Sequence, residues 1–157
     1  MDNINISQME QQDIPAVSRM YIALYEHLNE LGSALKLNTK RLEENLNMLV
    51  DSRLVKIILI RENGQPAGFV CVSIRPANKT FFAEGPQKTG FISELYVAPQ
   101  CRGKSYSKML LGAAEDFLKA SDIHISQLDV LVGNAPALSL YKSCGYSAHH
   151  TTFNKPL

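Results

Sequence analysis

Three features of this sequence could take part in chemistry. Residues 102–107 form a short polar run that follows an apolar stretch ended by Pro99. Glu94 places a carboxylate within that apolar stretch, and Tyr141 places a phenol in a later segment with helical spacing. A small and basic turn before a helix can bind an anion, a carboxylate can accept a proton, and a phenol can donate one. We therefore expect an anion-binding turn close to groups that move protons.

The elements around residues 102–107 indicate how an anion would be bound. Residues 91–97 are mostly apolar and aromatic, as in a buried strand, and an amphipathic helical pattern begins after the turn. The first N–H groups of a helix have no partner within the helix and carry the positive end of its dipole. The turn therefore predicts a bound phosphate group. The residues expected to hold it are Arg102, Gly103, Lys104, Ser105, Tyr106 and Ser107.

The order of residues in this turn excludes two familiar phosphate loops. No Lys-Ser or Lys-Thr follows a spaced pair of glycines, and no complete Gly-x-Gly-x-x-Gly is present. The turn instead resembles motif A of the GNAT superfamily of N-acyltransferases, Arg/Gln-x-x-Gly-x-Gly/Ala after a strand that ends in Val-x-Pro. In that family the loop cradles the pyrophosphate of acetyl-CoA. Ser105 and Ser107 replace the small residues of the motif, so we expect weakened binding.

Residues 134–146 resemble motif B of the same family, Asn-x-x-Ala-x-x-x-Tyr-x-x-x-Gly-Phe/Tyr, at every named position. Asn134 can cap the following helix, and Ala137 and Tyr141 share one face of it. The small Ala137 leaves room for a ligand. The resemblance implies that Tyr141 lies near the thioester sulfur and protonates the leaving thiolate. A tyrosine that only packs in the core is the alternative.

Glu94 has apolar neighbours, Ile92 and Tyr96, two positions away on each side. A carboxylate on a central strand is unfavourable unless it faces a cavity or has a partner. Partial burial would make it a better base for an acceptor ammonium, which must lose a proton before it attacks. Members of the family often place a Glu near this position for that purpose, directly or through water. A solvated carboxylate or a structural ion pair is the alternative.

The resemblance also implies how the rest of acetyl-CoA binds. In the family the central strand has a bulge and diverges from the next strand, which we expect here at residues 127–132. The gap admits the pantetheine arm, which pairs like an additional strand, and a backbone N–H there polarises the thioester carbonyl. Besides the six residues of the turn, the cofactor-binding residues implied are Leu95, Tyr96, Val97, Asn134, Ala137 and Tyr141.

The order of predicted elements is strand, two helices, three strands, helix, strand, helix and a last strand at residues 146–153. Asn63-Gly64 predicts a tight turn between the second and third strands. Early hairpins and a late strand-helix-strand crossover predict an α+β fold of three layers, with a mixed, mostly antiparallel sheet and helices on both faces. The order is that of the GNAT fold, which implies a single acyltransferase domain over residues 1–157.

The composition limits the classes of function. A net charge of +1 argues against a broad surface for nucleic acid or membranes. The N-terminus lacks a secretory signal, and no apolar run is long enough to span a bilayer. Cys71, Cys101 and Cys144 are too few and too far apart for a disulfide framework or a zinc site, so we expect a cytoplasmic protein without a metal. We expect Cys71 and Cys144 to be buried, whereas Cys101 lies in the polar turn.

Two functions fit the motifs. The first is an N-acetyltransferase that moves an acetyl group from acetyl-CoA to a primary amine of a small molecule or peptide, by direct attack in a ternary complex. The second is a non-catalytic sensor of acyl-CoA on the same fold, while a protein-interaction module would leave both motifs unexplained. A homodimer is left open. Acidic residues that either line the mouth for a cationic acceptor or form solvated helix faces are Glu26, Glu30, Glu43 and Glu44.

Overall fold

The computed structural model describes residues 3–77 and 84–157. Within these residues, five strands form one sheet in the order β1-β2-β3-β4-β5. The first four strands are antiparallel neighbours, and β5 runs parallel to β4. The sheet is therefore mixed and mostly antiparallel, as predicted. Its strands are β1 (Ile4–Gln8), β2 (Val55–Glu62), β3 (Gln65–Pro76), β4 (Lys88–Val97) and β5 (Ser126–Leu128).

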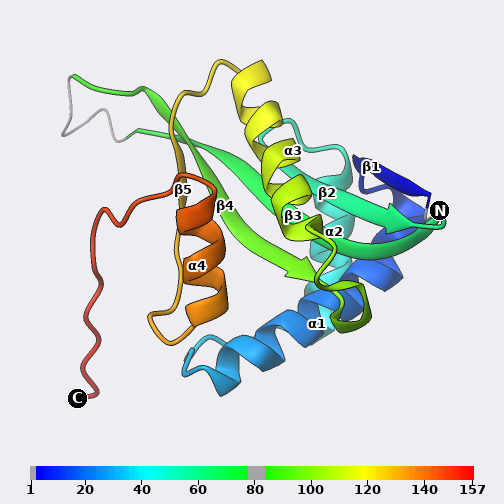
Figure 1. Cartoon of the computed structure of the whole chain (residues 1–157), viewed down its shortest axis with the longest axis horizontal. Coiled ribbons are helices and arrows are strands. Elements are labelled where there is room, and N and C mark those ends of the chain that lie inside the picture. The colour runs from blue at the N-terminus through cyan, green and yellow to red at the C-terminus, as the bar shows by residue number, and fades with distance from the viewer. Residues whose placement is uncertain (1–2, 78–83) are drawn as a thin grey trace.

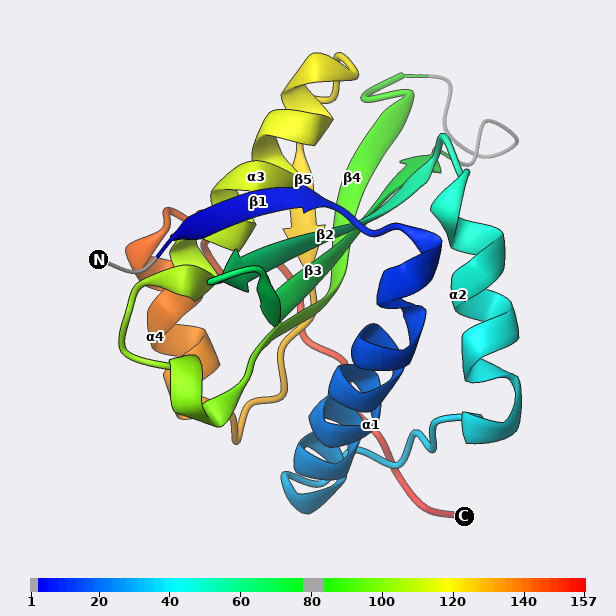
Figure 2. The same cartoon turned by 90° about the vertical axis from the view of Figure 1, so that its right-hand side faces the viewer.

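Helices cover both faces of the sheet, which confirms the three-layer α+β fold (Figure 1). Figure 2 shows α1 and α2 on one side of the sheet and α3 and α4 on the other. Alternate residues of β2 and β3 point to these two layers because side chains alternate along a strand. Leu59 and Phe69 are fully buried under α1 and α2, whereas Ile60 and Val70 are fully buried under α3. The helices are α1 (Ile14–Glu30), α2 (Leu42–Val50), α3 (Tyr106–Ala120) and α4 (Ala135–Ser143), and short 3-10 turns span Gln11–Asp13, Thr39–Arg41 and Pro99–Cys101.

The β2–β3 hairpin turns at Asn63 and Gly64, whose φ angles are 50° and 81°. Both residues therefore have the left-handed backbone of a type I′ turn, as the Asn-Gly pair predicts. The turn leaves Glu62 at the end of β2. This end of the sheet is also where the polar turn before α3 lies, because the hydroxyl of Tyr106 contacts the Glu62 carboxylate.

β4 contains a β-bulge at Ser93. Its pairing with β3 runs from Val72↔Ile92 directly to Cys71↔Glu94, so Ser93 is an extra residue. In a regular strand Ile92 and Glu94 would point to the same face. Here Ile92 is buried under α3, whereas Glu94 reaches the α1 face and contacts Tyr25. The bulge therefore places the two side chains on opposite faces, and it agrees with the bulge that the family resemblance implies for this strand.

β5 accompanies β4 for a short distance. The two strands pair from Gly90↔Ser126 to Ile92↔Leu128. Among the described residues, positions 93–97 of β4 pair only with β3. The predicted strand at 127–132 is thus shorter than expected, and Val132 is 88% exposed. The chain leaves the sheet after Leu128, so the main chain of residues 93–97 has no strand on its β5 side.

The prediction of a last strand at residues 146–153 is wrong. Residues 147–157 have no regular structure and are exposed, and Figure 1 shows them extending from α4 to the C-terminus. The hydroxyl of Tyr146 contacts Ser126 at 2.8 Å and Glu115 at 3.0 Å, which fixes the end of α4. Beyond it, Phe153 is the first large apolar side chain, and β5 offers only a short ladder. A strand there would bury too little apolar surface to be stable.

Several smaller expectations are also resolved. The sequence also predicts a long connection over residues 75–90 that contains the Phe81-Phe82 pair. β3 and β4 extend into this range, to Pro76 and from Lys88, and Phe81 and Phe82 lie outside the described residues. Cys71 is buried as expected, Cys101 is also buried, and Cys144 is only partly buried. Within the described part of the chain, no helix is both long and apolar enough to cross a membrane.

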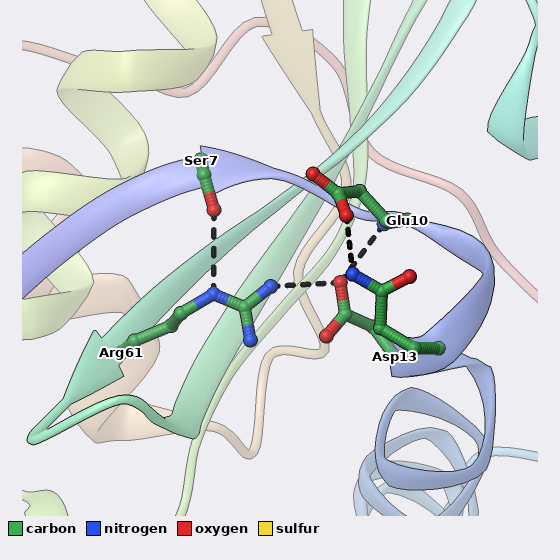
Figure 3. Close-up of polar contacts among 5 residues, drawn as sticks. Ser7, Glu10, Asp13 and Arg61 are labelled. Atoms are coloured by element: carbon green, nitrogen blue, oxygen red, sulfur yellow. Dashed lines mark hydrogen bonds and ion pairs between the residues drawn. The ribbon is translucent and has the colours of Figure 1, made fainter.

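A buried ion pair connects the start of α1 to β2 (Figure 3). Nη2 of Arg61 donates to Oδ2 of Asp13 at 2.7 Å, and the backbone N–H of Glu10 donates to the same oxygen at 2.8 Å. Nε of Arg61 also donates to the Ser7 hydroxyl at 3.3 Å. Burial acts to raise the pKa of Asp13, but the bonds from Arg61 and Glu10 outweigh it and hold that pKa below 3.8. These contacts fix the start of α1, the helix that faces Glu94.

Candidate active site

The backbone of residues 102–107 has the shape of an anion-binding turn. Gly103 and Ser105 have φ angles of 80° and 63°, in the left-handed region. Left-handed residues in such a turn direct successive N–H groups toward one point, which makes a concave site for an anion. The Ser105 side chain does not cap α3, so it leaves the first-turn N–H groups of Ser107 and Lys108 to other acceptors. The turn thus has the main-chain geometry that a phosphate group requires.

The two basic side chains of this turn contact the protein. Nε of Arg102 donates to the carbonyl oxygen of Val97 at 3.1 Å. Nζ of Lys104 binds the carboxylate of Glu62, which also accepts a hydrogen bond from the hydroxyl of Tyr106 at 2.6 Å. The bond from Lys104, followed by that from Tyr106, holds the pKa of Glu62 below its ordinary value. The charge of Lys104 is therefore shared with a carboxylate, and sequence reasoning missed Glu62 because it lies far away in the chain.

The peptide groups of Leu95 and Val97 face the open side of β4. The N–H of Ala98 donates to the carbonyl of Ala67 at 2.9 Å, so Ala98 directs its peptide groups toward β3. Along an antiparallel strand, the backbone N–H and C=O groups of successive residues point alternately to one neighbouring strand and to the other. The peptide groups of residues 94 and 96 therefore also point to β3, whereas those of residues 95 and 97 point to the β5 side. The carbonyl oxygen of Val97 accepts a hydrogen bond from the side chain of Arg102. Within the described residues, no strand lies opposite the peptide groups of Leu95.

Glu94 is surrounded by hydroxyl groups on the α1 face. The hydroxyl of Tyr25 donates to its Oε1 at 2.9 Å, and the hydroxyl of Tyr21 donates to its Oε2 at 3.2 Å. The Ser93 hydroxyl donates to Oε2 as well. Burial first, and the charge of Glu94 second, raise the pKa of the neighbouring Cys71 thiol to about 11, so this thiol stays protonated. The carboxylate is thus bound by neutral donors.

No cation neutralises Glu94 within the described part of the chain. The ion pairs found there join other residues, and the Glu94 carboxylate makes none. The described residues therefore provide no structural ion pair for Glu94, which was one alternative to its role as a base. A half-buried carboxylate without a counter-charge attracts a cation, and the ammonium form of an amine is such a cation.

Sequence reasoning missed Tyr21 and Tyr25. Its spacing in the sequence places Tyr21 on the apolar side of the first helix, and its ring does stack on Phe69 there, with centroids 4.6 Å apart. The available signal was the spacing, because tyrosines four residues apart present two hydroxyls on one helix face. That spacing does not reveal which residue the hydroxyls contact.

Tyr141 lies on α4 with its ring partly buried. The side chain of Asn134 accepts a hydrogen bond from the N–H of Ala137 at 3.3 Å and caps the helix, as predicted. The ring of Tyr141 packs edge-on against Tyr146 with centroids 6.1 Å apart, and it borders the core under α3. Burial raises its pKa above 10, so the phenol is protonated at neutral pH. Within residues 3–77 and 84–157, its hydroxyl makes no hydrogen bond.

The connection between β5 and α4 meets the end of α1. A Cβ placed on Gly133 would lie 3.8 Å from the carbonyl oxygen of Leu31, just after α1. The predicted acidic residues of the first two helices are all exposed, and Glu44 is paired with Arg41 at 3.1 Å. The loop that precedes α4 therefore lies close to the C-terminal end of α1, the helix that carries Tyr21 and Tyr25.

The described residues hold no group of three His, Cys, Asp or Glu side chains that could bind a metal ion. Two surface hollows, of about 540 and 230 Å³, lie beside the first half of α1. Neither is lined by Glu94, Arg102 or Tyr141. The second hollow is bordered by Tyr96, whose peptide groups face β3 and not the open side. The peptide groups of Leu95 and Val97 face the open side of β4, the polar turn follows this strand, and Tyr141 lies on α4.

The sequence profile of the Acetyltransferase (GNAT) family matches residues 21–146, which run from the middle of α1 to Tyr146, just beyond the end of α4. The match covers most of the chain and includes both the polar turn and α4. The protein therefore belongs to the GNAT acetyltransferase family.

Solved structures share this fold. An aminoglycoside N-acetyltransferase, AAC(6')-Iy, in complex with CoA has a TM-score of 0.81 at 14% identity, over 99% of this chain and 96% of that chain. A predicted acetyltransferase with acetyl-CoA from Clostridium acetobutylicum has a TM-score of 0.75 at 18% identity, over 98% and 96%. A ribosomal-protein-alanine N-acetyltransferase from Brucella melitensis biovar Abortus 2308 has a TM-score of 0.72 at 17% identity, over 99% of both chains. A comparison with curated protein sequences finds no match.

Proposed function

We propose that the protein transfers the acetyl group of acetyl-CoA to a primary amine, by direct attack of the amine on the thioester in a ternary complex. One observation carries this proposal. The bulge at Ser93 turns Glu94 toward α1, while the next residue, Leu95, directs its peptide groups to the open side of the same strand. A proton acceptor and a backbone donor for the thioester oxygen then lie on adjacent residues.

Acetyl-CoA fits along the open side of β4. Its pyrophosphate would occupy the turn formed by residues 102–107, whose left-handed positions direct backbone N–H groups toward an anion. Its pantetheine arm would pair with residues 95–97, which lack a strand on that side. Asn134, Ala137 and Tyr141 would border the thioester end. The solved structures with CoA and acetyl-CoA support this choice of co-substrate for the fold.

The reaction would proceed with balanced protons. The acceptor ammonium gives one proton to Glu94, directly or through water, and its nitrogen then forms a bond to the thioester carbon. The backbone N–H of Leu95 or Val97 stabilises the oxyanion that forms on the carbonyl oxygen. When the carbon–sulfur bond breaks, Tyr141 donates its proton to the thiolate. The attacking nitrogen then carries two protons: one returns to Tyr141, the other stays as the N–H of the amide, and Glu94 releases its proton to solvent.

The acceptor can be a small molecule or a peptide. Two similar structures are named for an aminoglycoside and for a ribosomal-protein alanine as acceptors of their own enzymes. At these identities they indicate the fold alone. A panel of acceptors must therefore include polyamines, aminoglycosides and peptides with free N-termini.

Two observations favour the non-catalytic sensor. Ser105 holds a left-handed backbone where glycine would be unstrained, and Lys104 is paired with Glu62. Both features weaken the expected affinity of the turn for pyrophosphate without preventing it. A protein that binds acetyl-CoA and releases no CoA with any amine would fit this second function.

An amine-panel assay tests the proposal. Purified protein is mixed with acetyl-CoA and each amine, CoA thiol release is followed with a chromogenic disulfide, and the acetylated product is identified by mass spectrometry. We expect amine-dependent release that falls by about two orders of magnitude in Glu94→Gln. Calorimetry provides the second measurement, and no binding of acetyl-CoA at near-millimolar concentration would reject both the transferase and the sensor.

A further inference from the structure

We propose that Tyr21 and Tyr25 are positioning residues, which hold the carboxylate of Glu94 in place and leave one position on its Oε1 for the acceptor amine. The inference rests on the proposed function and extends it to two side chains of α1. Neither residue belongs to the two motifs of the polar turn and α4.

The two rings are fixed by packing before they contact Glu94. Tyr21 and Tyr25 lie four residues apart on α1, and their rings are nearly parallel, at 8° with centroids 6.5 Å apart. Tyr21 is also stacked on Phe69, a fully buried residue of β3. Both hydroxyls therefore reach the carboxylate from a preorganised pair of rings.

The hydrogen bonds to Glu94 are distributed unevenly between its two oxygens. Oε2 accepts from Tyr21 and from Ser93, whereas Tyr25 is the one hydroxyl of the described residues that donates to Oε1. The thiol of Cys71, a weak donor, also contacts the carboxylate. A carboxylate has about four acceptor positions, two on each oxygen. Oε2 is therefore saturated, and Oε1 keeps one position. A single N–H of an ammonium group matches that position.

Both tyrosines act as donors at neutral pH. Burial first, and the charge of Glu94 in addition, raise the pKa of Tyr21 and of Tyr25 well above the ordinary value of 10. Neither phenol can therefore accept the proton of the acceptor. The proton goes to Glu94, and the tyrosines determine where its carboxylate lies.

Neutral donors are well suited to hold a carboxylate that must receive a cation. A Lys or Arg partner would cancel the charge of Glu94 and compete with the acceptor ammonium. Hydroxyl groups orient the carboxylate and leave its net charge in place, and the protonated thiol of Cys71 is neutral too. The cluster therefore keeps one negative charge beside the open side of β4.

Kinetics of phenylalanine variants test the proposal. Tyr21→Phe and Tyr25→Phe retain the rings and remove one donor each, and we expect kcat/KM for the amine to fall about tenfold in each. The KM for acetyl-CoA should not change. Ser18→Ala removes a hydroxyl from the same helix without contact to Glu94 and serves as the matched control. Unchanged kcat/KM in both phenylalanine variants, with only a lower thermal midpoint, would show a merely structural role and overturn the proposal.

A second measurement does not require turnover. In protein labelled at the tyrosine Cζ carbons, the resonances of Tyr21 and Tyr25 should shift together when acid protonates Glu94. Glu94→Gln should abolish this shift, while the resonance of Tyr141, whose hydroxyl makes no hydrogen bond within the described residues, provides an internal reference. Independent shifts, or shifts that persist in Glu94→Gln, contradict the contact. If the wild-type protein acetylates no amine but the coupled shift is present, the proposed function fails while the arrangement of Tyr21, Tyr25 and Glu94 stands.

Discussion

Glu62, at the end of β2, binds the side chain of Lys104 in the polar turn before α3. This contact joins the end of β2 to the turn before α3, which lies 42 residues later in the sequence. It places a negative charge beside the turn where the pyrophosphate of acetyl-CoA would bind. Glu62 is therefore expected to moderate the affinity of that turn for anions.

Replacement of Glu62 by Gln should tighten CoA binding. Gln can still accept the hydrogen bond from Tyr106, but it no longer neutralises Lys104, so the turn gains a net positive charge. We expect the Kd for CoA to fall about threefold at low ionic strength, and the gain to disappear at high salt because salt screens exposed charges. Calorimetry at two salt concentrations measures both effects. Asp116→Asn, which removes an exposed charge of α3, is the matched control. A higher Kd for CoA in Glu62→Gln would mean that Glu62 acts mainly by holding the conformation of the turn through Lys104 and Tyr106.

Replacement of Ser105 by Gly should stabilise the protein. Ser105 has a φ of 63°, and the left-handed backbone costs a residue with a Cβ about 1 kcal/mol. Glycine has no such cost, so the free energy of unfolding should rise by roughly 0.5–1 kcal/mol, and CoA should bind more tightly. Ser107→Gly lies inside α3 and should instead lower stability by a similar amount. Urea unfolding of the two variants gives opposite signs if this account is correct.

Replacement of Tyr141 by Phe tests the proposed acid. The variant retains the ring that packs against Tyr146 but has no proton for the leaving thiolate. We expect kcat to fall about a hundredfold with little change in the KM for acetyl-CoA. Tyr146→Phe loses contacts to Ser126 and Glu115 and should lower the thermal midpoint more than kcat. Equal turnover of Tyr141→Phe and wild type with every amine would exclude Tyr141 as the acid.

The Asp13–Arg61 ion pair predicts a dependence of stability on pH. The pKa of Asp13 in the folded protein lies below its ordinary value of 3.8, so the carboxylate stabilises the fold above about that pH. This contribution is lost as the pH falls through the lowered pKa. Asp13→Asn should therefore destabilise the protein by about 3 kcal/mol at pH 7, because it leaves Arg61 buried without its partner. The difference from wild type should shrink toward pH 3.

Urea unfolding at pH 7 and pH 3 checks this prediction. Asp122→Asn, whose side chain is 94% exposed and contacts His124, is the control and should change stability by less than about 0.5 kcal/mol at either pH. An Asp13→Asn effect that stays constant over this range would exclude the ionised carboxylate as its cause.

Local patterns predicted the parts of the fold that depend on neighbouring residues. Asn63-Gly64 predicted its turn because both residues tolerate a positive φ, and Asn134 predicted its cap because its side chain reaches the nearby N–H of Ala137. The order of helices and strands followed from apolar periodicity, which indicates the buried side of each element. The last strand was not predictable in this way, because β5 is too short to support it.

The contacts of the candidate site could not be predicted from local patterns. Tyr21 and Tyr25 meet Glu94 across about seventy residues of sequence, and Glu62 meets Lys104 across about forty. Such contacts depend on how elements pack, which periodicity does not specify. The family resemblance implies a bulge in this strand, but its position at Ser93 is not visible in the sequence, because one extra residue leaves the apolar composition of β4 unchanged.

The extra residue at Ser93 exchanges the roles of odd and even positions along β4. Before it, the even positions Gly90 and Ile92 face α3, and after it the odd positions Leu95 and Val97 do. Polar substitutions should therefore be tolerated least at even positions before the bulge and at odd positions after it, because these side chains face the core under α3. If Ser93 were paired as a regular strand residue instead of forming a bulge, the carboxylate of Glu94 would enter the apolar layer and Leu95 would turn toward α1. The bulge, rather than the identity of any one side chain, decides which side chains of β4 face α1 and which face α3.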